Sequence, residues 1–409
     1  MTTMTGGQYS FFRGLFGLYL CVHFAHLLPW GAELFANSGV IADAGSSPLF
    51  GIIPNILALS DGPLMVQGLL TSALLASFAF LIGFRDKWAA IWILYVLICV
   101  FARNPLIANP SLPYAGWMLL AHLFIPSKPF GSFDARNDET LAAQWAFPRH
   151  VYLAAVIVLA LSYSYSGYTK LLSPSWVSGD AISYVLQNPL ARDHFLNDLL
   201  QLSPTFLKLL TWFILYVELA YVLLAINHKV HLWSWAMMLL VQFGFLVFLN
   251  FADLTFAMLL MHLFTFAPRW AKPKTAPQEE VVYYDGDCGF CHGFIRILLA
   301  EDKASNFKYS PLGSDYFNKH IDADQRDSLP TSVLVQTAQG KIKMKSEAVS
   351  HCLIALGGLW GLMGHLLTLL PVKVANVAYD WIGSIRYKLA KKPDGACPLL
   401  HPSLSKRFV

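Results

Sequence analysis

The sequence "VVYYDGDCGFCHGF", residues Val281 to Phe294, contains the clearest structural signal in this chain. An apolar run predicts a buried strand, and the residues after it have the pattern of an amphipathic helix. A Cys-x-x-Cys pair, Cys288 and Cys291, lies at the junction. The first sulfur of such a pair lies at a helix N-terminus, where free amides and the helix dipole favour the thiolate. The stretch therefore predicts redox chemistry.

We expect Cys288 to be the attacking thiol and Cys291, one turn further along, to resolve the mixed disulfide. Asp285 and Asp287 precede the pair, and their negative charge disfavours a thiolate, which favours a dithiol tuned toward reduction. His292 would counter that charge if its ring lies close. Half of a zinc site and an idle pair are the alternatives, but zinc needs four ligands and no second Cys-x-x-Cys or His-x-x-x-His follows.

Further strand patterns continue the domain as far as the C-terminus, at residues 307–312, 331–337 and 341–346, the last two as a hairpin. The order strand, helix, strand, hairpin and helix predicts a thioredoxin-like α/β domain. Pro330 precedes the third strand, where thioredoxin folds place a cis-proline loop opposite the dithiol; an ordinary proline at a strand entry is the alternative. The amphipathic helices at the end would cap this domain or lie on a membrane surface.

Four motifs occur in order between Val281 and Val409: "YYDGDCGFC", "ALGGLWGLMGHLLTLLP", "VAYDWIGSIRYKLA" and "ACPL". Together they resemble the DCC family of thiol-disulfide oxidoreductases. The resemblance implies a thioredoxin-like fold and thiol-disulfide exchange with a partner protein. The tail cysteine of that family corresponds to Cys397, whose role is open; a packed structural cysteine is the simpler interpretation.

The composition of the whole chain is that of a membrane protein. Of its 409 residues, 56% are hydrophobic and only 13% are charged, and the mean hydropathy is +0.50. Ordinary soluble domains are far more polar. The net charge of +4 is small and the basic residues are scattered, so no nucleic-acid surface is indicated. Six cysteines, unevenly spread, do not form a disulfide scaffold. The expected partner of most of this chain is the lipid bilayer.

Apolar runs predict a bundle of about eight membrane helices within residues 1–270, near residues 11–29, 64–84, 88–103, 113–126, 149–168, 205–226, 231–249 and 254–268. The first run lacks a convincing cleavage site, so we expect it to be retained. Basic residues gather on one side of these spans, which predicts that both termini and the dithiol domain face the cytoplasm and that the Trp30 to Pro63 loop faces outward. Residues 271–280 predict a linker before a separate domain at 281–409.

The fifth expected span has unusual polarity where it ends. Helical spacing places four of its residues on one face, namely Tyr163, Ser166, Gly167 and Lys170. A desolvated lysine in a polar cleft can act as a base, whereas a lysine that only reaches the membrane interface is the alternative. Glu218, in a later span, is a candidate partner of Lys170. His23 and His26, at i, i+3 in the first span, would either bind a metal or hydrogen-bond between helices.

The same segment resembles the HTTM domain, the membrane part shared with vitamin K-dependent gamma-carboxylase, through Gly167, Lys170, Trp176 and Gly179. The resemblance extends over residues 9–269 and implies that Lys170 is the base that deprotonates vitamin K hydroquinone. Two features depart from the carboxylase: Thr169 replaces the first of two lysines, and the large lumenal peptide-binding region is absent. Glutamate carboxylation is therefore not expected.

The sequence predicts an integral membrane thiol-disulfide oxidoreductase of the protein-disulfide reductase type, coupled to an HTTM-like bundle that acts on a membrane-delivered substrate. No metal is assigned and no cofactor is certain, although a vitamin K-like quinone would suit the bundle. One alternative is a quinone-linked carboxylase-like or epoxidase-like enzyme with an accessory dithiol. The other is a non-enzymatic maturation or transport factor that binds a peptide or a lipid.

Overall fold

The computed structural model describes residues 4–107, 109, 111–136, 145–250, 252–274, 279–389 and 405–409. They divide into two compact units. The dithiol unit combines Met1–Ser10, Lys128–Ala146 and Ala267–Val409, and the helical unit contains Phe11–Ser127 and Phe147–Phe266. Cys397 lies outside the described residues, so its role stays open.

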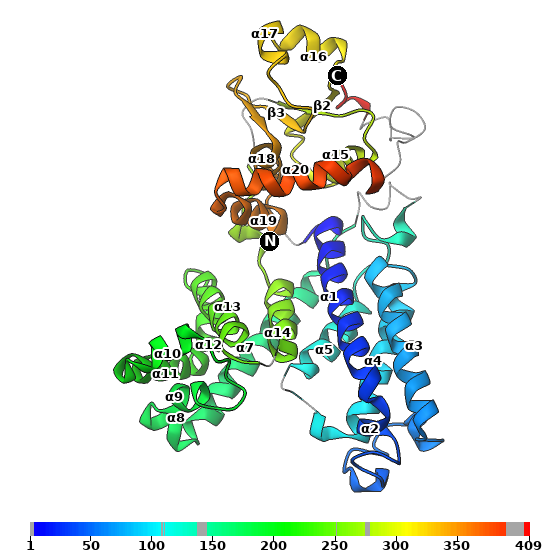
Figure 1. Ribbon diagram of the computed structural model, residues 1–409, viewed down its shortest axis with the longest axis vertical. Coiled ribbons are helices and arrows are strands. Elements are labelled where there is room, and N and C mark those ends of the chain that lie inside the picture. The colour runs from blue at the N-terminus through cyan, green and yellow to red at the C-terminus, as the bar shows by residue number, and fades with distance from the viewer. Residues whose placement is uncertain are drawn as a thin grey trace. The chain divides into compact units, whose positions relative to one another are not determined.

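A mixed four-stranded sheet forms the centre of the dithiol unit (Figure 1), in the order β2-β1-β3-β4. The strands are β1 (Glu280–Tyr284), β2 (Phe307–Pro311), β3 (Leu334–Gln336) and β4 (Ile342–Met344). Val282 of β1 lies opposite Tyr309 in the parallel pair with β2 and opposite Val335 in the antiparallel pair with β3. All five residues of β1 are buried, which explains why its sequence is a continuous run without polar alternation. The predicted strands are confirmed.

Helices cover both faces of this sheet, as Figure 1 shows. On one face, α16 (Asp315–His320) contributes Phe317 to a core cluster with Tyr283 and Leu334. Elsewhere, α20 (Val372–Leu389) packs on both α15 (Gly289–Glu301) and α18 (Lys345–Leu356), and α19 (Gly358–Leu369) packs on α18. The amphipathic C-terminal helices therefore cap the small domain, which was one of the two expectations.

The N-terminal segment is held on the same unit by a buried carboxylate. Glu301, the last residue of α15, accepts a hydrogen bond from the backbone N–H of Gly7 at 2.9 Å. Thr5 Oγ1 and Trp360 Nε1 donate to its other oxygen. The first N–H groups of a helix have no partner within it, so a carboxylate stabilises the start of α1 (Gly6–Leu27). Burial raises the pKa of Glu301, although the hydrogen bonds from Thr5 and Trp360 act in the opposite direction.

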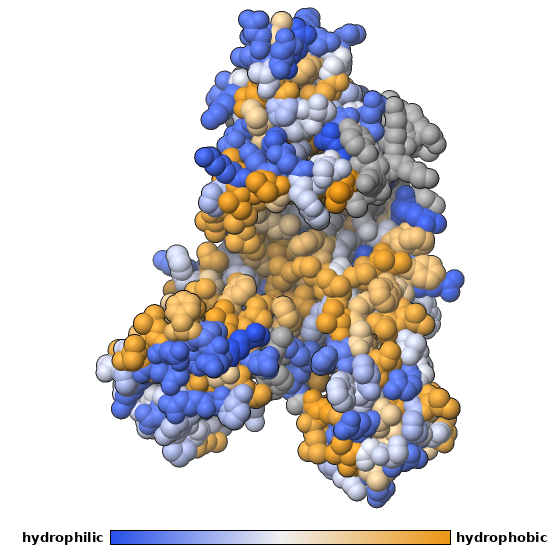
Figure 2. All heavy atoms as spheres, in the orientation of Figure 1, coloured by the Kyte–Doolittle hydropathy of each residue, from blue (hydrophilic) through white to orange (hydrophobic). Residues whose placement is uncertain are grey.

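Every expected span in the helical unit forms helix: α1, α3 (Pro63–Ile82), α4 (Asp86–Arg103), α5 (Leu112–His122), α7 (Arg149–Leu171), α11 (Pro204–Leu219), α12 (Tyr221–Ile226), α13 (His231–Phe248) and α14 (Ala252–Phe264). Large hydrophobic side chains lie exposed on their outer faces, among them Leu75, Leu161 and Leu240. Figure 2 shows this apolar colouring over the helices. A soluble protein rarely exposes so much apolar surface.

Fewer helices reach the length of a membrane span than the eight that the sequence predicts. Among the described residues, four helices are long and apolar enough to cross a membrane, or up to six if two bent helix pairs each form one span. One of these pairs is α10 (Phe195–Gln201) with α11, and the other is α19 with α20 in the dithiol unit. With 11 and 13 residues, α5 and α14 would each extend at most about 20 Å, whereas a hydrocarbon core is about 30 Å thick. Their apolar runs were counted as spans because composition alone does not show where a helix ends.

Short helices that the sequence analysis missed lie in the loop regions, namely α2 (Gly31–Phe35), α8 (Pro174–Ser178), α9 (Ala181–Leu186) and α10 (Phe195–Gln201). The chain bends by 95° between α10 and α11, which begins at Pro204. Proline suits a first helical position because it has no N–H to satisfy there.

Charged side chains inside the helical unit are paired. Arg13 Nη1 lies 3.3 Å from Asp86 Oδ2, and Arg103 Nη2 lies 3.1 Å from Asp61 Oδ2. His122 Nε2 is 3.6 Å from the same oxygen of Asp86. An unpaired charge in an apolar environment is strongly unfavourable, so these pairs explain how a hydrophobic bundle contains them.

Candidate functional site

The dithiol lies at the N-terminus of α15, directly after the turn that ends β1. Cys288 is the N-cap residue, and its Sγ accepts a hydrogen bond from the backbone N–H of Cys291 at 3.3 Å. Both side chains are free thiols; Cys288 is completely buried and Cys291 is 4% exposed. A sulfur that accepts an amide hydrogen bond at a helix N-terminus is stabilised as a thiolate. The structure therefore places the first cysteine where the sequence expected it.

The two cysteines have different environments. Burial raises the pKa of Cys291 to about 12, and its contact with the sulfur of Cys288 acts in the same direction. The positive charge of Arg386 opposes these effects. Cys291 therefore keeps its proton at neutral pH, and Cys288 is the sulfur to which hydrogen bonds are donated.

A buried ion pair neutralises the carboxylate nearest the dithiol. Arg386 Nη2 lies 3.0 Å from Asp285 Oδ2, and the backbone N–H of Asp287 donates to Asp285 Oδ1 at 3.0 Å. Both side chains of the ion pair are 10% exposed. The sequence analysis expected the negative charge of Asp285 to disfavour a thiolate, and this carboxylate does act to raise the pKa of Cys291. Arg386, which the sequence analysis did not consider, acts in the opposite direction.

The remaining supporting residues of the turn act on its backbone. His292 Nε2 lies 2.9 Å from the carbonyl oxygen of Gly286, and the ring packs edge-on against Tyr284 at a centroid distance of 5.3 Å. A nitrogen that faces a carbonyl must donate, so this imidazole stabilises the turn before the dithiol. Asp287 is exposed, and its backbone N–H donates the hydrogen bond to Asp285 Oδ1 described above.

Two hydrogen bonds join the loop before β3 to α20, the helix that carries Arg386. Arg386 Nη1 donates to the carbonyl of Thr331 at 3.1 Å, and the N–H of Val333 donates to Tyr379 Oη at 2.9 Å. No described peptide bond is cis, so Pro330 is the ordinary strand-entry proline that the sequence left as the alternative. Burial raises the pKa of Tyr379, which stays a neutral hydroxyl.

A pocket of about 460 Å³ opens beside the dithiol, between α15 and α20. Its lining includes Cys291, Phe294, Val333, Tyr379, Ile382 and Arg386. Phe290 and Ile382 on its rim are 43% and 38% exposed. An apolar pocket with one cation beside a dithiol can hold an apolar side chain of a partner whose disulfide is exchanged.

Arg386 and Tyr379 are site residues that the sequence analysis did not single out. Both lie in the motif "VAYDWIGSIRYKLA", which was used only for the family resemblance. Their spacing of i, i+7 puts them on one face of a helix, and Ile382 lies between them on that face. This periodicity was a usable signal, but nothing local shows that the face meets the dithiol.

In the helical unit, the structure brings together most of the residues expected around Lys170. Lys170 Nζ donates to the carboxylate of Glu218 and, at 3.1 Å, to Ser166 Oγ. It also lies 4.7 Å from the ring centre of Trp176, within reach of a cation–π interaction. A Cβ on Gly167 would lie 2.4 Å from the backbone N of Leu219. Glycine there allows α7 and α11 to approach closely.

Two expected members lie outside this cluster. The hydroxyl of Tyr163 is 3.3 Å from His262 Nε2 and accepts a hydrogen bond from Gln242 at 3.1 Å. Gly179 ends α8 with φ of +89°, a left-handed conformation that favours glycine, and a Cβ there would lie 2.4 Å from Lys208 Cγ. Gly179 therefore has a structural role, and the Tyr163 hydroxyl hydrogen-bonds with Gln242 and His262 and not with Lys170.

Replacing Arg386 tests the electrostatics of the dithiol. Arg386→Gln removes the cation that lowers the pKa of Cys291 and removes the positive charge that opposes the Asp285 carboxylate, and both changes disfavour a thiolate. We expect the thiolate absorbance of the dithiol to appear about one pH unit higher than in the wild type, measured against a Cys288→Ser/Cys291→Ser blank. The melting temperature should also fall, because a buried charge loses its partner.

The matched control is Asp285→Asn/Arg386→Gln, which removes both charges. It should return the thiolate titration toward that of the wild type and recover part of the lost stability. An Arg386→Gln titration that overlays the wild type would show that the guanidinium does not act on the dithiol.

Comparison with known proteins agrees with this geometry. Residues 282–392 match the family described as DCC1-like thiol-disulfide oxidoreductase. The uncharacterized protein YuxK of Bacillus subtilis (strain 168) is 28% identical over 134 residues, which cover 32% of this chain and 94% of that protein. No solved structure matches. The dithiol unit thus carries a DCC1-like thiol-disulfide oxidoreductase domain at residues 282–392.

Proposed function

We propose that this protein is an integral membrane thiol-disulfide oxidoreductase that reduces a disulfide in a protein or peptide partner. The observation that carries the proposal is the position of Cys288 Sγ at the start of α15, where the amide of Cys291 donates to it. The strand order β2-β1-β3-β4, with β3 antiparallel to β1, supports a thioredoxin-like fold for the domain. The family match at residues 282–392 supports the chemistry.

The exchange proceeds in two balanced steps. The Cys288 thiolate attacks one sulfur of the partner's disulfide, that S–S bond breaks, and the other partner sulfur leaves as a thiolate that takes up a proton. Cys291 then loses its proton and attacks Cys288 Sγ. The mixed disulfide breaks, the second partner sulfur is released as a thiol, and a Cys288–Cys291 disulfide remains. An external dithiol reductant must restore the reduced pair.

The burial of the pair sets a requirement on the partner. Cys288 is completely buried, whereas Cys291 lines the pocket between α15 and α20. We infer that an apolar side chain next to the partner's disulfide enters this pocket and displaces Phe290 and Ile382 on its rim. Exchange would then be selective for disulfides with apolar neighbours and slow with small polar disulfides.

Serine variants of the two cysteines test the assignment of roles. Cys291→Ser removes the resolving thiol, so the mixed disulfide between Cys288 and the natural partner should accumulate. Cys288→Ser removes the nucleophile and should trap nothing. The measurement is non-reducing electrophoresis after alkylation, with mass spectrometry of any adduct. Equal trapping by both variants, or by neither while the wild type remains active, would reduce the dithiol to a structural pair.

We further propose that the dithiol unit lies in the cytoplasm and that the Trp30 to Pro63 loop lies outside. The positive-inside bias places the N-terminus, the loop around Lys128 and the C-terminal domain on one side. The compact dithiol unit combines these same segments, residues 1–10, 128–146 and 267–409. Segments that pack together must lie on one side of a membrane, which supports the assignment.

Introduced cysteines at exposed positions test this topology. A membrane-impermeant maleimide should label Ser46→Cys in intact cells and should label Asp324→Cys only after lysis. The background is Cys397→Ser, because the five described cysteines are buried and Cys397 lies outside the described residues. Labelling of Asp324→Cys in intact cells would place the dithiol in an oxidising compartment and reverse the expected direction of electron flow.

A second candidate function is that the helical unit carries its own base chemistry on a lipid-soluble substrate, with Lys170 as the base. The observation behind it is the cluster of Lys170, Glu218 and Trp176. The side chain of Glu218 is 5% exposed and that of Lys170 is 19% exposed. Lys170 Nζ donates a hydrogen bond to Glu218, so a substrate would have to displace this contact before it could react with the amine.

Substitution of Lys170 separates its structural role from a catalytic one. Lys170→Ala leaves a buried carboxylate unpaired and should lower the free energy of unfolding by about 3 kcal/mol, seen as a lower melting temperature. Lys170→Arg keeps the pair and should melt like the wild type, yet it should lose any activity that needs a neutral amine. Wild-type melting of Lys170→Ala would contradict the structural role, and an active Lys170→Arg would contradict the base.

A further inference from the structure

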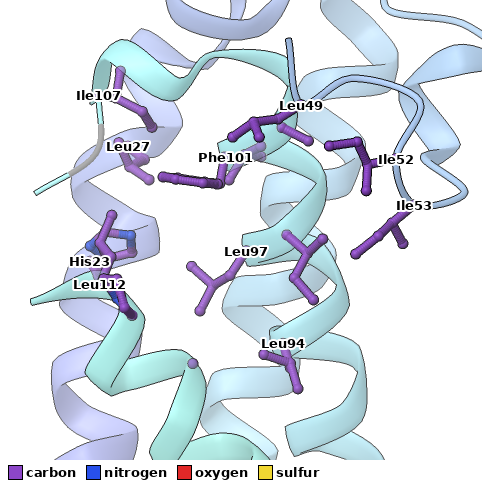
Figure 3. Close-up of a pocket in the computed structure, with 15 residues that line it drawn as sticks. His23, Leu27, Leu49, Ile52, Ile53, Leu94, Leu97, Phe101, Ile107 and Leu112 are labelled. Carbon is purple, nitrogen blue, oxygen red and sulfur yellow. The ribbon is translucent and has the colours of Figure 1, made fainter. Parts of the chain in front are cut away.

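A second pocket, of about 350 Å³, lies in the helical unit among α1, α4, α5 and the loop that precedes α3. Figure 3 shows Leu27 on α1, Leu97 and Phe101 on α4, and Ile52 and Ile53 on the loop. Of the described residues that line it, only His23 has a polar side chain. The volume suits a small lipid-like molecule, and the lining offers it apolar contacts apart from His23.

The polar surroundings of His23 determine which ring nitrogen carries the proton. His23 Nδ1 lies 3.2 Å from Asp253 Oδ1. Tyr19 Oη donates to that oxygen at 2.9 Å, and Asn109 Nδ2 donates to Asp253 Oδ2 at 2.6 Å. An ionised carboxylate only accepts hydrogen bonds, so His23 must donate through Nδ1. In the neutral ring Nε2 is then an acceptor, oriented by the same hydrogen bond.

That acceptor has no hydrogen-bond partner within the part of the chain that the structure describes. The side chain of His23 is 9% exposed, and the pocket wall around it is apolar. Nε2 is therefore available to accept a hydrogen bond from a molecule in the pocket that His23 lines. A ligand that brings one hydrogen-bond donor and an apolar body would satisfy the ring and fill the cavity together.

We propose that this pocket binds a lipid alcohol, a molecule with an apolar chain or ring and one hydroxyl group that donates to His23 Nε2. Carbonyls and ethers of the same shape are disfavoured, because they present an acceptor to an acceptor. Asp253, Tyr19 and Asn109 select the hydroxyl indirectly, by holding the tautomer. Ile52 and Ile53, which are 69% and 44% exposed, form an apolar rim for entry. The site is separate from the dithiol and does not depend on the redox proposal.

The test uses the full chain in detergent micelles and a twelve-carbon primary alcohol that carries a diazirine and a terminal alkyne. After irradiation, the crosslink should map by mass spectrometry to peptides that contain residues 49–53 and 94–101. Dodecan-1-ol should compete about fivefold better than 1-methoxydodecane or dodecanal, the factor that one net hydrogen bond provides. Farnesol and 4-tert-butylphenol, compared with dodecan-1-ol, distinguish branched-chain, ring and straight-chain alcohols as the source of the hydroxyl.

Two variants test whether His23 causes the preference for the alcohol and whether the cavity is the site of the crosslink. His23→Phe keeps an aromatic ring but removes the acceptor, so crosslinking should persist while the preference for the alcohol over the ether disappears. Leu97→Trp fills the cavity and should abolish the crosslink, whereas Leu161→Trp, on an exposed helix face, should leave it unchanged. Each variant is compared only if it elutes as a single symmetric peak in size-exclusion chromatography, which shows that it is folded.

The proposal is overturned if the alcohol and the ether compete equally in the wild-type chain, which would mean a general acyl-chain crevice. It is also overturned if His23→Phe retains the alcohol preference, or if the crosslink maps to other peptides. The wild-type competition decides the question even if a variant fails to fold.

Discussion

The ion pair between Asp285 and Arg386 is the interaction on which the dithiol site depends. Asp285 belongs to the turn between β1 and the dithiol, and Arg386 lies on α20 and also binds the carbonyl of Thr331 in the loop before β3. One guanidinium therefore joins three segments that meet around two buried sulfurs. It also opposes the unfavourable effect of the Asp285 carboxylate on a thiolate. A partly buried pair with bonds to both a carboxylate and a backbone carbonyl holds its geometry closely, as thiol exchange requires.

The helical unit follows the same physical rule in a more apolar setting. Its charged groups have partners on other helices. Arg13 pairs with Asp86 and Lys170 with Glu218, and the Asp253 carboxylate accepts a hydrogen bond from the neutral ring of His23. Each pair lowers the free energy of placing a charge in the unit, and each also fixes the position of a polar atom. Lys170 is directed at a carboxylate, whereas His23 presents a nitrogen to an apolar pocket. The same ion pairs and hydrogen bonds that stabilise the helical unit thus also hold polar atoms in positions where a ligand could bind them.

The dithiol unit is built from distant parts of the chain, and this arrangement has a functional consequence. Glu301 binds the first turn of α1, and Gln8 accepts a hydrogen bond from the N–H of Leu359. The first turn of α1 therefore belongs to the core of the dithiol unit, although it lies far from the redox domain in the sequence.

Local patterns in the sequence determined the strands of the dithiol domain, the helix after Cys288 and the apolar character of the first 270 residues. These features depend on neighbours within one or two turns, so spacing and composition suffice to predict them. Tertiary structure alone decided that Arg386 compensates Asp285 and that Cys288 is completely buried. It also decided that Tyr163 and Lys170, both on α7, have different hydrogen-bond partners. The number of helices long enough to span a bilayer depended on where each helix ends. These features depend on contacts between segments far apart in the chain, and no local sequence pattern shows which distant side chain will make a given contact.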